Sequence, residues 1–248
     1  SLILMGNYFY WRCFSVITSY DLQTQSDEKL DLNKFKIVVI VPAFNEERFI
    51  GSVVLKLLMH PVEVLVIDDG SSDNTAKIAS AAGARVISRD DNIGKGAALN
   101  LGFNQARRYR PDAVVMIDAD GQHQPEELPK VIAPILNQQA DICVGSRYLG
   151  DTSNTPRHRR IGHKLINLAT SVPSGINITD SQSGFRAFSP RAPELIQFHS
   201  ADFTVESEMQ FLAREYNLKV VEIPITIRYT DGAKRPAVQQ GITVLNGI

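Results

Sequence analysis

The sequence predicts an α/β protein with a mostly parallel central sheet flanked by helices. From residue 36 to residue 145, short apolar runs alternate with segments of helical period, and this order produces a parallel sheet with helices on its faces. Polar side chains follow several of the apolar runs, at the strand ends where open α/β sheets bind ligands. With 44% hydrophobic and 21% charged residues, the chain of 248 residues has the composition of an ordinary globular protein.

Each expected strand is a short apolar run, and each expected helix carries apolar residues three or four positions apart. The first strand, 36–41, ends at Pro42, which is followed by an expected helix over 46–59. The alternation then continues with strands at 62–67, 84–87, 113–117 and 140–144, and with helices from Asp73-Asn74 through Ala82, over 96–109, and from Pro125. Beyond residue 150 we expect helices over 157–170 and 204–216, a strand over 219–227 and a basic loop over 230–236.

Charge and cysteine content exclude some classes of protein. The net charge of -1 gives no global attraction to nucleic acid, so we expect no nucleic-acid partner. Cys13 and Cys143 lie among apolar residues without the spacing of a metal site. We interpret both as reduced thiols of a cytosolic protein.

Both terminal segments differ from the central part. Residues 1–34 form an apolar segment and a polar linker, but Asn7 and Arg12 interrupt the apolar part, which is too short for a membrane span. This segment could lie in a membrane interface or pack on the domain. Residues 237–248 have an apolar rhythm, and we expect them to begin a membrane-proximal segment, part of which could be missing.

The strongest local signal follows the strand at 113–117. Asp118 and Asp120, one residue apart, come directly after the buried run, and Gln122 follows them. Charge at the end of a buried strand costs free energy unless it is paired, and these hard oxygen ligands suit Mg²⁺ or Mn²⁺. The alternative is a turn in which Asp120 hydrogen-bonds locally. His123 could be a fourth ligand, but we expect it to be a solvated loop histidine.

Acidic residues also follow the first two strands. Asn45 could cap the next helix and Glu46 would be favoured by the helix dipole, although a nucleotide contact is the sharper interpretation. A turn after the second strand would not require two adjacent acidic residues, yet Asp68 and Asp69 stand there. A carboxylate at this position can accept hydrogen bonds from ribose hydroxyls or a base N–H.

Glycine and basic residues supply candidate anion sites. Lys95 lies between two glycines in the loop 92–96, which allows close backbone approach, but neither a Walker A loop nor a G-x-G-x-x-G motif is present. Separate basic residues could bind phosphate: Arg147, Arg186, Arg228 and Lys234. The basic face of the helix expected over 157–170 suits either an anionic membrane surface or an ordinary exposed surface.

Taken in order, these motifs resemble those of the family 2 glycosyltransferases of the GT-A fold, and especially the dolichyl-phosphate sugar synthases. The resemblance covers residues 35–236 and rests on the motifs Pro42-Ala43-Phe44-Asn45-Glu46, Ile67-Asp68-Asp69-Gly70-Ser71, Asn92-x-Gly94-Lys95-Gly96, Asp118-Ala119-Asp120-Gly121-Gln122, Gly145-Ser146-Arg147-Tyr148 and Ser183-Gly184-Phe185-Arg186. It implies one GT-A (Rossmann-like) domain with a nucleotide-sugar half, 35–150, and an acceptor half with additional helices, 151–236.

The resemblance also implies roles for individual residues. The nucleotide-sugar would be bound by Pro42, Phe44, Glu46, Ile67, Asp68, Asp69, Lys95, Asp118, Ala119, Asp120, Arg228 and Lys234. Phe44 stands where relatives often have tyrosine, so a hydroxyl contact would be missing. Mg²⁺ or Mn²⁺ would be held against the diphosphate by Asp118, Asp120 and Gln122. The acceptor phosphate would be bound by Arg147, Ser183 and Arg186, with Asp120 and Arg147 as the catalytic residues.

The implied reaction is inverting transfer of a sugar from a UDP- or GDP-sugar to a polyprenyl or dolichyl phosphate, at the cytoplasmic face of a membrane. The phosphate oxygen is already anionic, so no strong general base is needed. Transfer to a sugar hydroxyl is one alternative, and it would need a base such as Asp180, Glu206 or Glu208. A nucleotidyltransferase would be expected to carry a glycine-rich basic loop near its first strand. A non-catalytic binding protein would be expected to lack a metal ligand.

Overall fold

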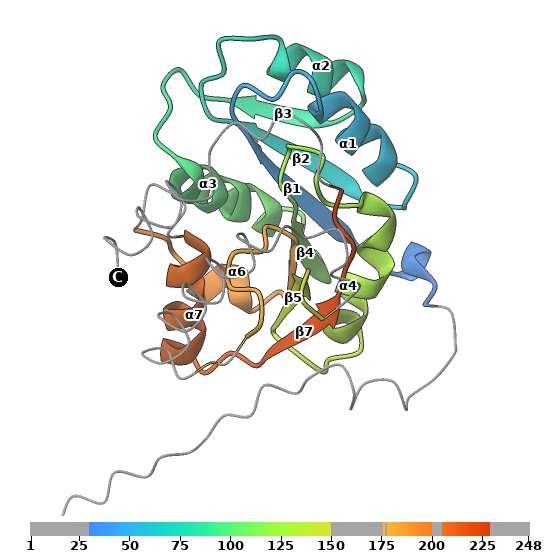
Figure 1. Ribbon diagram of the computed structural model, residues 1–248, viewed down its shortest axis with the longest axis vertical. Coiled ribbons are helices and arrows are strands. Elements are labelled where there is room, and N and C mark those ends of the chain that lie inside the picture. The colour runs from blue at the N-terminus through green and yellow to red at the C-terminus, as the bar shows by residue number, and fades with distance from the viewer. Residues whose placement is uncertain (1–29, 150–175, 177, 200–204, 229–248) are drawn as a thin grey trace, which may run out of the picture.

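The computed structural model describes residues 30–149, 176, 178–199 and 205–228, which build a seven-stranded sheet (Figure 1). The strand order is β3-β2-β1-β4-β6-β5-β7. Neighbouring strands are parallel except around β6, which is antiparallel to both β4 and β5. The strands are β1 (Ile37–Ala43), β2 (Glu63–Asp68), β3 (Arg85–Ser88), β4 (Ala113–Met116), β5 (Ile142–Ser146), β6 (Arg186–Phe188) and β7 (Val220–Pro224). The predicted α/β class with a mostly parallel sheet is confirmed.

Helices cover both faces of the sheet (Figure 1). One face packs against α1 (Ile50–Leu57), α2 (Thr75–Ala81) and α4 (Leu128–Leu136), and the other against α3 (Lys95–Arg107), α6 (Ala192–Leu195) and α7 (Val205–Glu215). Short 3₁₀ turns lie at Leu32–Lys34 and Pro125–Glu127. None of the described helices combines the length and the hydropathy that a membrane crossing requires.

Strand β1 shows why the sheet is buried on both sides. Its side chains point alternately to opposite faces, so Ile37, Val39 and Val41 join one core while Val38 and Ile40 join the other. All five side chains are at most 1% exposed. An uninterrupted apolar run is therefore the pattern that this central parallel strand requires.

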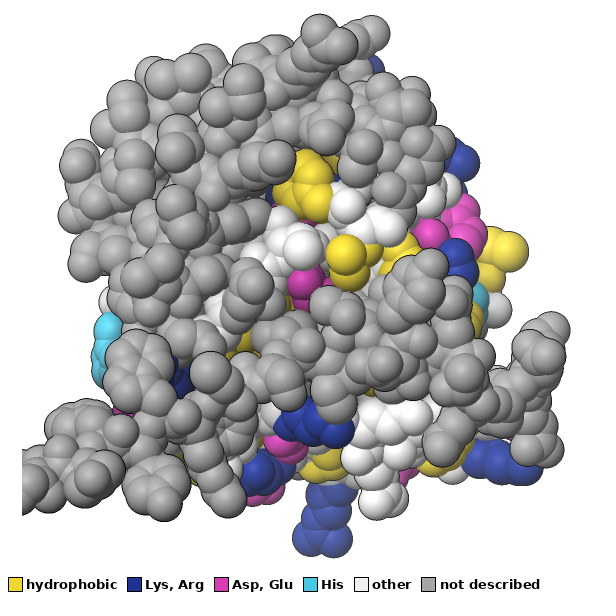
Figure 2. Space-filling view, turned by 60° about the horizontal axis from the view of Figure 1, so that its bottom comes forward, with side chains coloured by type: hydrophobic (Ala, Val, Ile, Leu, Met, Phe, Trp, Pro, Cys, Tyr) yellow, Lys and Arg dark blue, Asp and Glu magenta, His cyan; other side chains and the backbone are white. Residues whose placement is uncertain are grey.

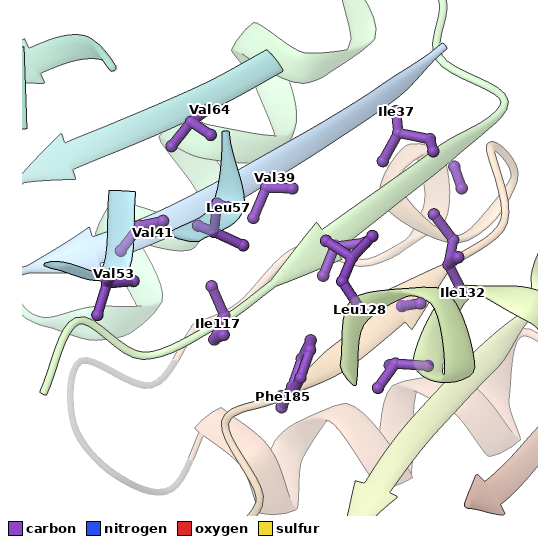
Figure 3. Close-up of a cluster of buried hydrophobic side chains, with 14 of the residues drawn as sticks. Ile37, Val39, Val41, Val53, Leu57, Val64, Ile117, Leu128, Ile132 and Phe185 are labelled. Carbon is purple, nitrogen blue, oxygen red and sulfur yellow. The ribbon is translucent and has the colours of Figure 1, made fainter. Parts of the chain in front are cut away.

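The core beneath α1 and α4 brings together residues far apart in the chain (Figure 3). Val53 and Leu57 lie one turn apart on α1, and Leu128 and Ile132 lie one turn apart on α4, which places each pair on one helix face. Phe185, just before β6, packs into the same core. Full burial of each such side chain contributes roughly 1.5–3 kcal/mol, so this core fixes the start of β6 as well as the two helices.

Helix α3 lies unusually close to β1 at Gly102. A Cβ atom added to Gly102 would lie 2.5 Å from Cγ2 of Ile40. The absence of a side chain at this position therefore sets the distance between the helix and the sheet, and with it the position of Lys95 at the start of α3.

The first helix begins later than the sequence predicts. The sequence predicts a start at residue 46, whereas α1 begins at Ile50, and the backbone N–H groups of Glu46 and Glu47 donate to the side chains of Thr75 and Asp73. Asn45 adopts a left-handed conformation with φ 53° and accepts a hydrogen bond from Ser72 N, 2.9 Å away. These contacts between loops replace the expected cap by Asn45.

Neither β6 nor α6 was predicted from the sequence, and both lie within or close to a segment rich in Ser, Gly and Asp. With three residues, β6 is too short to show a period, and it forms because the open edges of β4 and β5 supply its hydrogen-bond partners. The helix expected over 157–170, the terminal segments 1–29 and 229–248, and the basic loop that contains Lys234 lie outside the described residues.

Two further observations concern charge and thiols. Lys and Arg side chains are interspersed with Asp and Glu side chains on the face that Figure 2 shows, in keeping with the net charge of -1. Cys143 is a free thiol buried in β5, and burial raises the pKa of this thiol. The buried position agrees with the apolar residues that surround Cys143 in the sequence.

Candidate active site

The strand register brings most of the predicted motifs to one edge of the sheet. Pro42 pairs with Ile67 across β1 and β2, and Ile40 pairs with Met116 across β1 and β4. The loops after these parallel strands therefore leave the sheet at the same edge. Because β6 runs in the opposite direction, its first residue, Arg186, also lies there. The glycine-containing loop before β6 thus joins the loops that follow β1, β2, β4 and β5.

Lys95 lies between two carboxylates at the centre of this edge. Its Nζ atom is 2.6 Å from Oδ1 of Asp118 and 2.5 Å from Oε1 of Glu206, the latter on α7. Burial by itself lowers the pKa of Lys95, but the charges of the two carboxylates outweigh burial and raise it above its ordinary value. Burial raises the pKa of Asp118, whereas Lys95 and then His123 hold it below the usual range. Lys95 and Asp118 are therefore both charged at neutral pH.

The backbone of Gly184 covers the Asp118 carboxylate. A Cβ atom at Gly184 would overlap both carboxylate oxygens of Asp118, so glycine is the residue that permits this approach. The Asp118 carboxylate is consequently confined between the Lys95 ammonium on α3 and the chain segment that enters β6.

Asp120 carries a charge that the protein itself leaves poorly compensated. Burial, then Asp118 and Glu46, raise its pKa to about 6, against the hydrogen bond that the backbone N–H of Gln122 donates to Oδ1 over 3.0 Å. The local turn that the sequence allows at Asp120 is therefore present, but it does not remove the repulsion between Asp118 and Asp120.

This donor set fits Mg²⁺ or Mn²⁺. Two carboxylates with excess negative charge, and the amide oxygen of Gln122, are hard ligands that a dication would stabilise. In the described ranges no group of three or more His, Cys, Asp or Glu side chains is arranged to hold a metal ion. Mg²⁺ commonly binds through one or two carboxylates, with substrate phosphates and water completing its shell.

The predicted nucleotide contacts divide into exposed and buried side chains. Phe44 is 43% exposed and Glu46 is half-buried. The side chains of Pro42, Ile67 and Ala119 are buried, so a ligand at this edge would meet these three residues mainly through their backbone.

Asp68 and Asp69 are buried and bind the chain itself. Asp69 accepts hydrogen bonds from the N–H groups of Gly94, at 2.7 Å, and Ile93, at 3.3 Å. Asp68 accepts from the N–H of Ser71 at 3.2 Å. The acidic pair therefore shapes the loops on either side of it and holds the segment that leads into Lys95. Direct contact of either carboxylate with a nucleoside stays a prediction.

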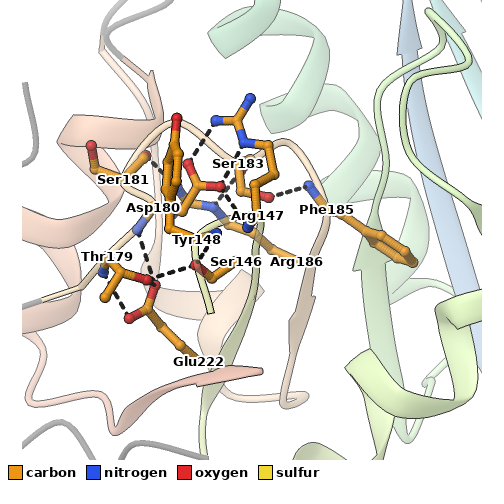
Figure 4. Close-up of polar contacts among 10 residues, drawn as sticks. All are labelled: Ser146, Arg147, Tyr148, Thr179, Asp180, Ser181, Ser183, Phe185, Arg186 and Glu222. Atoms are coloured by element: carbon orange, nitrogen blue, oxygen red, sulfur yellow. Dashed lines mark hydrogen bonds and ion pairs between the residues drawn. The ribbon is translucent and has the colours of Figure 1, made fainter. Parts of the chain in front are cut away.

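Arg147 is fixed by a bidentate ion pair with Asp180 (Figure 4). Its Nε and Nη2 atoms each lie 2.6 Å from one carboxylate oxygen of Asp180, and its backbone N–H donates to the same carboxylate over 3.0 Å. Asp180 is fully buried. Two parallel charged hydrogen bonds fix the plane of a guanidinium group, so the orientation of Arg147 is set before any ligand arrives.

Glu222 on β7 holds the segment that carries Asp180, the partner of Arg147, and lies below it in Figure 4. Its carboxylate accepts hydrogen bonds from the N–H of Thr179 at 2.7 Å, the N–H of Asp180 at 3.1 Å and the hydroxyl of Thr179. The Thr179 hydroxyl also lies 2.6 Å from the hydroxyl of Ser146 on β5. Glu222 is fully buried, and this burial raises its pKa to about 7 although the hydrogen bonds lower it.

Arg186 and Ser183 do not fit their predicted role at the acceptor phosphate. Arg186 is 1% exposed and Ser183 is fully buried. The Arg186 guanidinium donates to the carbonyl oxygens of Ser183, at 2.9 Å, and Ser181, at 2.6 Å, and it contacts Met209. The arginine instead holds the loop before β6 against α7, because buried carbonyl groups there need donors.

His123 is also corrected by the structure. It was expected in solvent, but it is 7% exposed, its ring packs edge-on against Phe185, and its backbone bridges to Ile227. Burial lowers the pKa of His123 to about 4, so the ring is neutral at pH 7. Its partners lie far away in sequence, so nothing in the neighbouring residues could have indicated this burial.

The remaining predicted residues are placed as follows. Arg228 is exposed, and its N–H donates to the carbonyl of Gln122 over 2.8 Å, which brings it beside the predicted metal loop. Lys234 lies outside the described residues. The sequence presents Asp180 and Glu206 only as candidate general bases. It does not predict that Asp180 pairs with Arg147 or that Glu206 pairs with Lys95.

Comparisons with known proteins identify the family of this chain. The model of glycosyl transferase family 2 matches residues 38–194. The chain is 34% identical to the UDP-N-acetylglucosamine–dolichyl-phosphate N-acetylglucosaminyltransferase of Methanococcus voltae, over 79% of this chain and 86% of that protein. It is 31% identical to the polyprenol monophosphomannose synthase of Mycolicibacterium smegmatis, over 77% of each chain.

Solved structures show the same fold. A glucosyl-3-phosphoglycerate synthase from Mycobacterium tuberculosis, crystallised with Mn²⁺, uridine diphosphate and glucosyl-3-phosphoglycerate, superposes with a TM-score of 0.67 at 23% identity. The match covers 86% of this chain and 78% of that one. With the family match over most of the described sheet and the shared arrangement of strands, the chain belongs to glycosyltransferase family 2 and has the GT-A fold.

Proposed function

We propose that this protein is a metal-dependent inverting glycosyltransferase that moves a sugar from a UDP- or GDP-sugar to a polyprenyl phosphate such as dolichyl phosphate. The observation that carries the proposal is the Arg147–Asp180 pair, which presents a fixed guanidinium at the same sheet edge as Asp118 and Asp120. Arg147 lies near enough to lower the pKa of Asp118. The charge of Arg147 therefore acts on one of the two carboxylates that we propose as cation ligands.

The donor side follows from the acidic loops. Asp118, Asp120 and Gln122 would hold Mg²⁺ or Mn²⁺ against the diphosphate, with Arg228 and Lys234 as further cations, while Phe44 and Glu46 would border the nucleoside. The bound metal would offset the charge that develops on the departing nucleoside diphosphate.

The acceptor side would use Arg147 to orient the lipid phosphate. One phosphate oxygen attacks C1 of the sugar, a new C1–O bond forms, and the bond from C1 to the diphosphate breaks on the opposite side, which inverts the anomeric configuration. The attacking oxygen is already anionic, so positioning and electrostatics supply the catalysis.

A hydroxyl acceptor is less well supported, because it needs a general base. Both oxygens of Asp180 bind Arg147. Glu206 binds Lys95, and Glu208 accepts a hydrogen bond from the N–H of His199 at 2.7 Å. Each base candidate from the sequence therefore already has a partner in the protein through at least one carboxylate oxygen, and an acceptor that carries its own negative charge needs none of them as a base.

The names of the relatives support the same acceptor, since two of them transfer sugars to dolichyl or polyprenyl phosphates. A lipid-linked acceptor implies action at a membrane surface, which we place at the cytoplasmic face.

A nucleotidyltransferase and a non-catalytic binding protein fit this chain less well. Asn45-Glu46-Glu47 stands where a nucleotidyltransferase would carry a glycine-rich basic loop. Both predicted metal carboxylates, Asp118 and Asp120, are retained, unlike the expectation for a protein that only binds a nucleotide-sugar.

A transfer assay tests the proposal. A panel of UDP- and GDP-sugars is incubated with dolichyl phosphate and Mn²⁺ or Mg²⁺, and lipid-linked sugar is measured. We expect Asp120→Ala to abolish transfer and Arg147→Ala to raise KM for the lipid phosphate more than KM for the donor. Arg108→Ala, an exposed arginine at the far end of α3, is the matched control and should behave as wild type.

Two results would contradict the assignments. Full activity of Asp120→Ala would exclude the metal site, and equal loss of donor and acceptor affinity in Arg147→Ala would exclude its assigned contact with the acceptor. Transfer to a hydroxyl group of a glycan, without transfer to dolichyl phosphate, would support the hydroxyl acceptor instead.

A further inference from the structure

We propose that Glu206 is a positioning residue that acts through Lys95 to set the affinity of Asp118 for the divalent cation. This inference rests on the metal-dependent function proposed above. It assigns to α7, an element of the acceptor half, an influence on the cation site of the donor half that passes through Lys95.

The geometry places Glu206 one ion pair away from the predicted metal ligand. Lys95 Nζ bridges Glu206 Oε1 and Asp118 Oδ1 with distances of 2.5 and 2.6 Å. Glu206 is 3% exposed, and its second oxygen, Oε2, is buried without a hydrogen-bond partner among the described residues. Burying a carboxylate that is supported by a single cation costs free energy of folding. Local stability therefore does not explain why Glu206 lies beside Lys95.

Contacts with the loop before β6 hold the first turn of α7, on which Glu206 lies. Gln182 Nε2 donates to the hydroxyl of Ser207 over 3.0 Å, and Arg186 donates to the carbonyl of Ser181 while reaching toward α7. The same loop contains Gly184, whose backbone covers Asp118. The helix that carries Glu206 is therefore bonded to the same loop that confines Asp118.

Charge explains what Glu206 does there. Lys95 and Asp118 alone would form a neutral pair, and the ammonium group would compete with a metal cation for the same carboxylate. Glu206 adds a second negative charge, so the cluster of Lys95, Asp118 and Glu206 has a net charge of -1. Lys95 is shared between the two carboxylates, which weakens its hold on Asp118. Asp118 thereby keeps its orientation without losing its attraction for a dication.

The experiment measures Mn²⁺ binding directly, by electron paramagnetic resonance of the free aquo ion, with and without UDP. Glu206→Gln keeps an acceptor for Lys95 but removes the charge, and we expect it to weaken Mn²⁺ binding by about 10–100-fold, the usual effect of altering a group behind a metal ligand. Glu208→Gln is the matched control, with the same charge change on the same helix, and its Kd should stay within about twofold of wild type.

A double-mutant cycle tests whether the effect passes through Lys95. In a Lys95→Met background, we expect Glu206→Gln to change the Kd for Mn²⁺ much less than in the wild type. An equal effect in both backgrounds would overturn the positioning role. Unchanged Mn²⁺ affinity in Glu206→Gln alone would also overturn it, whether or not the Lys95 variants fold, as judged by circular dichroism.

The readout separates this inference from the proposed function. If the wild type binds Mn²⁺ but does not transfer sugar to dolichyl phosphate, the acceptor assignment fails while the Glu206 effect is still measured. If the wild type binds no Mn²⁺ with or without UDP, the metal site and the role of Glu206 both fail.

Discussion

Individual charged residues at the sheet edge are held by partners from distant parts of the sequence. Arg147 binds Asp180, Lys95 binds Glu206, and Glu222 lies beneath the Thr179–Asp180 turn. Each pair puts a buried charge in a set orientation, which is the condition for electrostatic catalysis without rearrangement. The residues that would touch substrate depend on these supporting carboxylates.

Glu222 should make stability depend on pH. Its pKa of about 7 in the folded protein exceeds the ordinary value of 4.5, so the folded state binds the proton more tightly. The resulting stabilisation is complete below about pH 4.5 and is lost as pH rises to about 7, a change of about 3 kcal/mol. Urea denaturation of the wild type and of Glu222→Gln across this range should show the wild type losing stability relative to the variant.

The comparison between the two proteins isolates Glu222 from other groups that titrate in the same range, such as Asp120. A constant difference in unfolding free energy between wild type and Glu222→Gln, from about pH 4.5 to about pH 8, would show that Glu222 ionises as freely in the folded state as in the unfolded chain.

At the scale of helices and strands, close packing of α3 on β1 is the feature most sensitive to a single methyl group. Gly102→Ala places a Cβ 2.5 Å from Cγ2 of Ile40, and we expect a loss of about 1–3 kcal/mol from overpacking, although alanine favours a helix more than glycine does. Denaturant titration measures the loss. In an Ile40→Ala background the same change should cost much less, and equal costs would contradict the packing argument.

The same scale shows what the sequence could and could not predict. Strands such as β1 were predictable because an apolar run buried on both faces leaves a local pattern, and the carboxylates after β4 were predictable because charge directly follows such a run. Strand β6 was not, because its three residues depend on edges supplied by β4 and β5. The burial of His123 and the capture of Arg186 by backbone carbonyls likewise depend on contacts across the fold.

For the whole molecule, nucleotide and metal should stabilise the fold together. If Asp118 and Asp120 hold a cation against a diphosphate, the UDP–Mn²⁺ complex, added at about 100 times its Kd, should stabilise the protein by about 2.7 kcal/mol, or about 5–10 °C in Tm. Each ligand alone should do less, and EDTA should remove most of the UDP effect. The measurement is differential scanning calorimetry, with Asp120→Ala as the control that lacks the joint effect.

An equal shift from UDP in the presence of EDTA and in the presence of Mn²⁺ would indicate that the nucleotide binds without the cation. The shared site proposed at the sheet edge would then be incorrect, although the family assignment would be unaffected because it rests on sequence and fold.

The position of β6 in the sheet has a consequence for the order of folding. Strand β5 pairs with β6 and β7 and with no other described strand, and both partners are synthesised only from Arg186 onward. A nascent chain that has reached residue 150 therefore exposes β5 with two unpaired, apolar edges, which is a hazard for aggregation. The sheet is completed only when β6 and β7 return to β5 from distant parts of the sequence, and such non-local pairing slows folding.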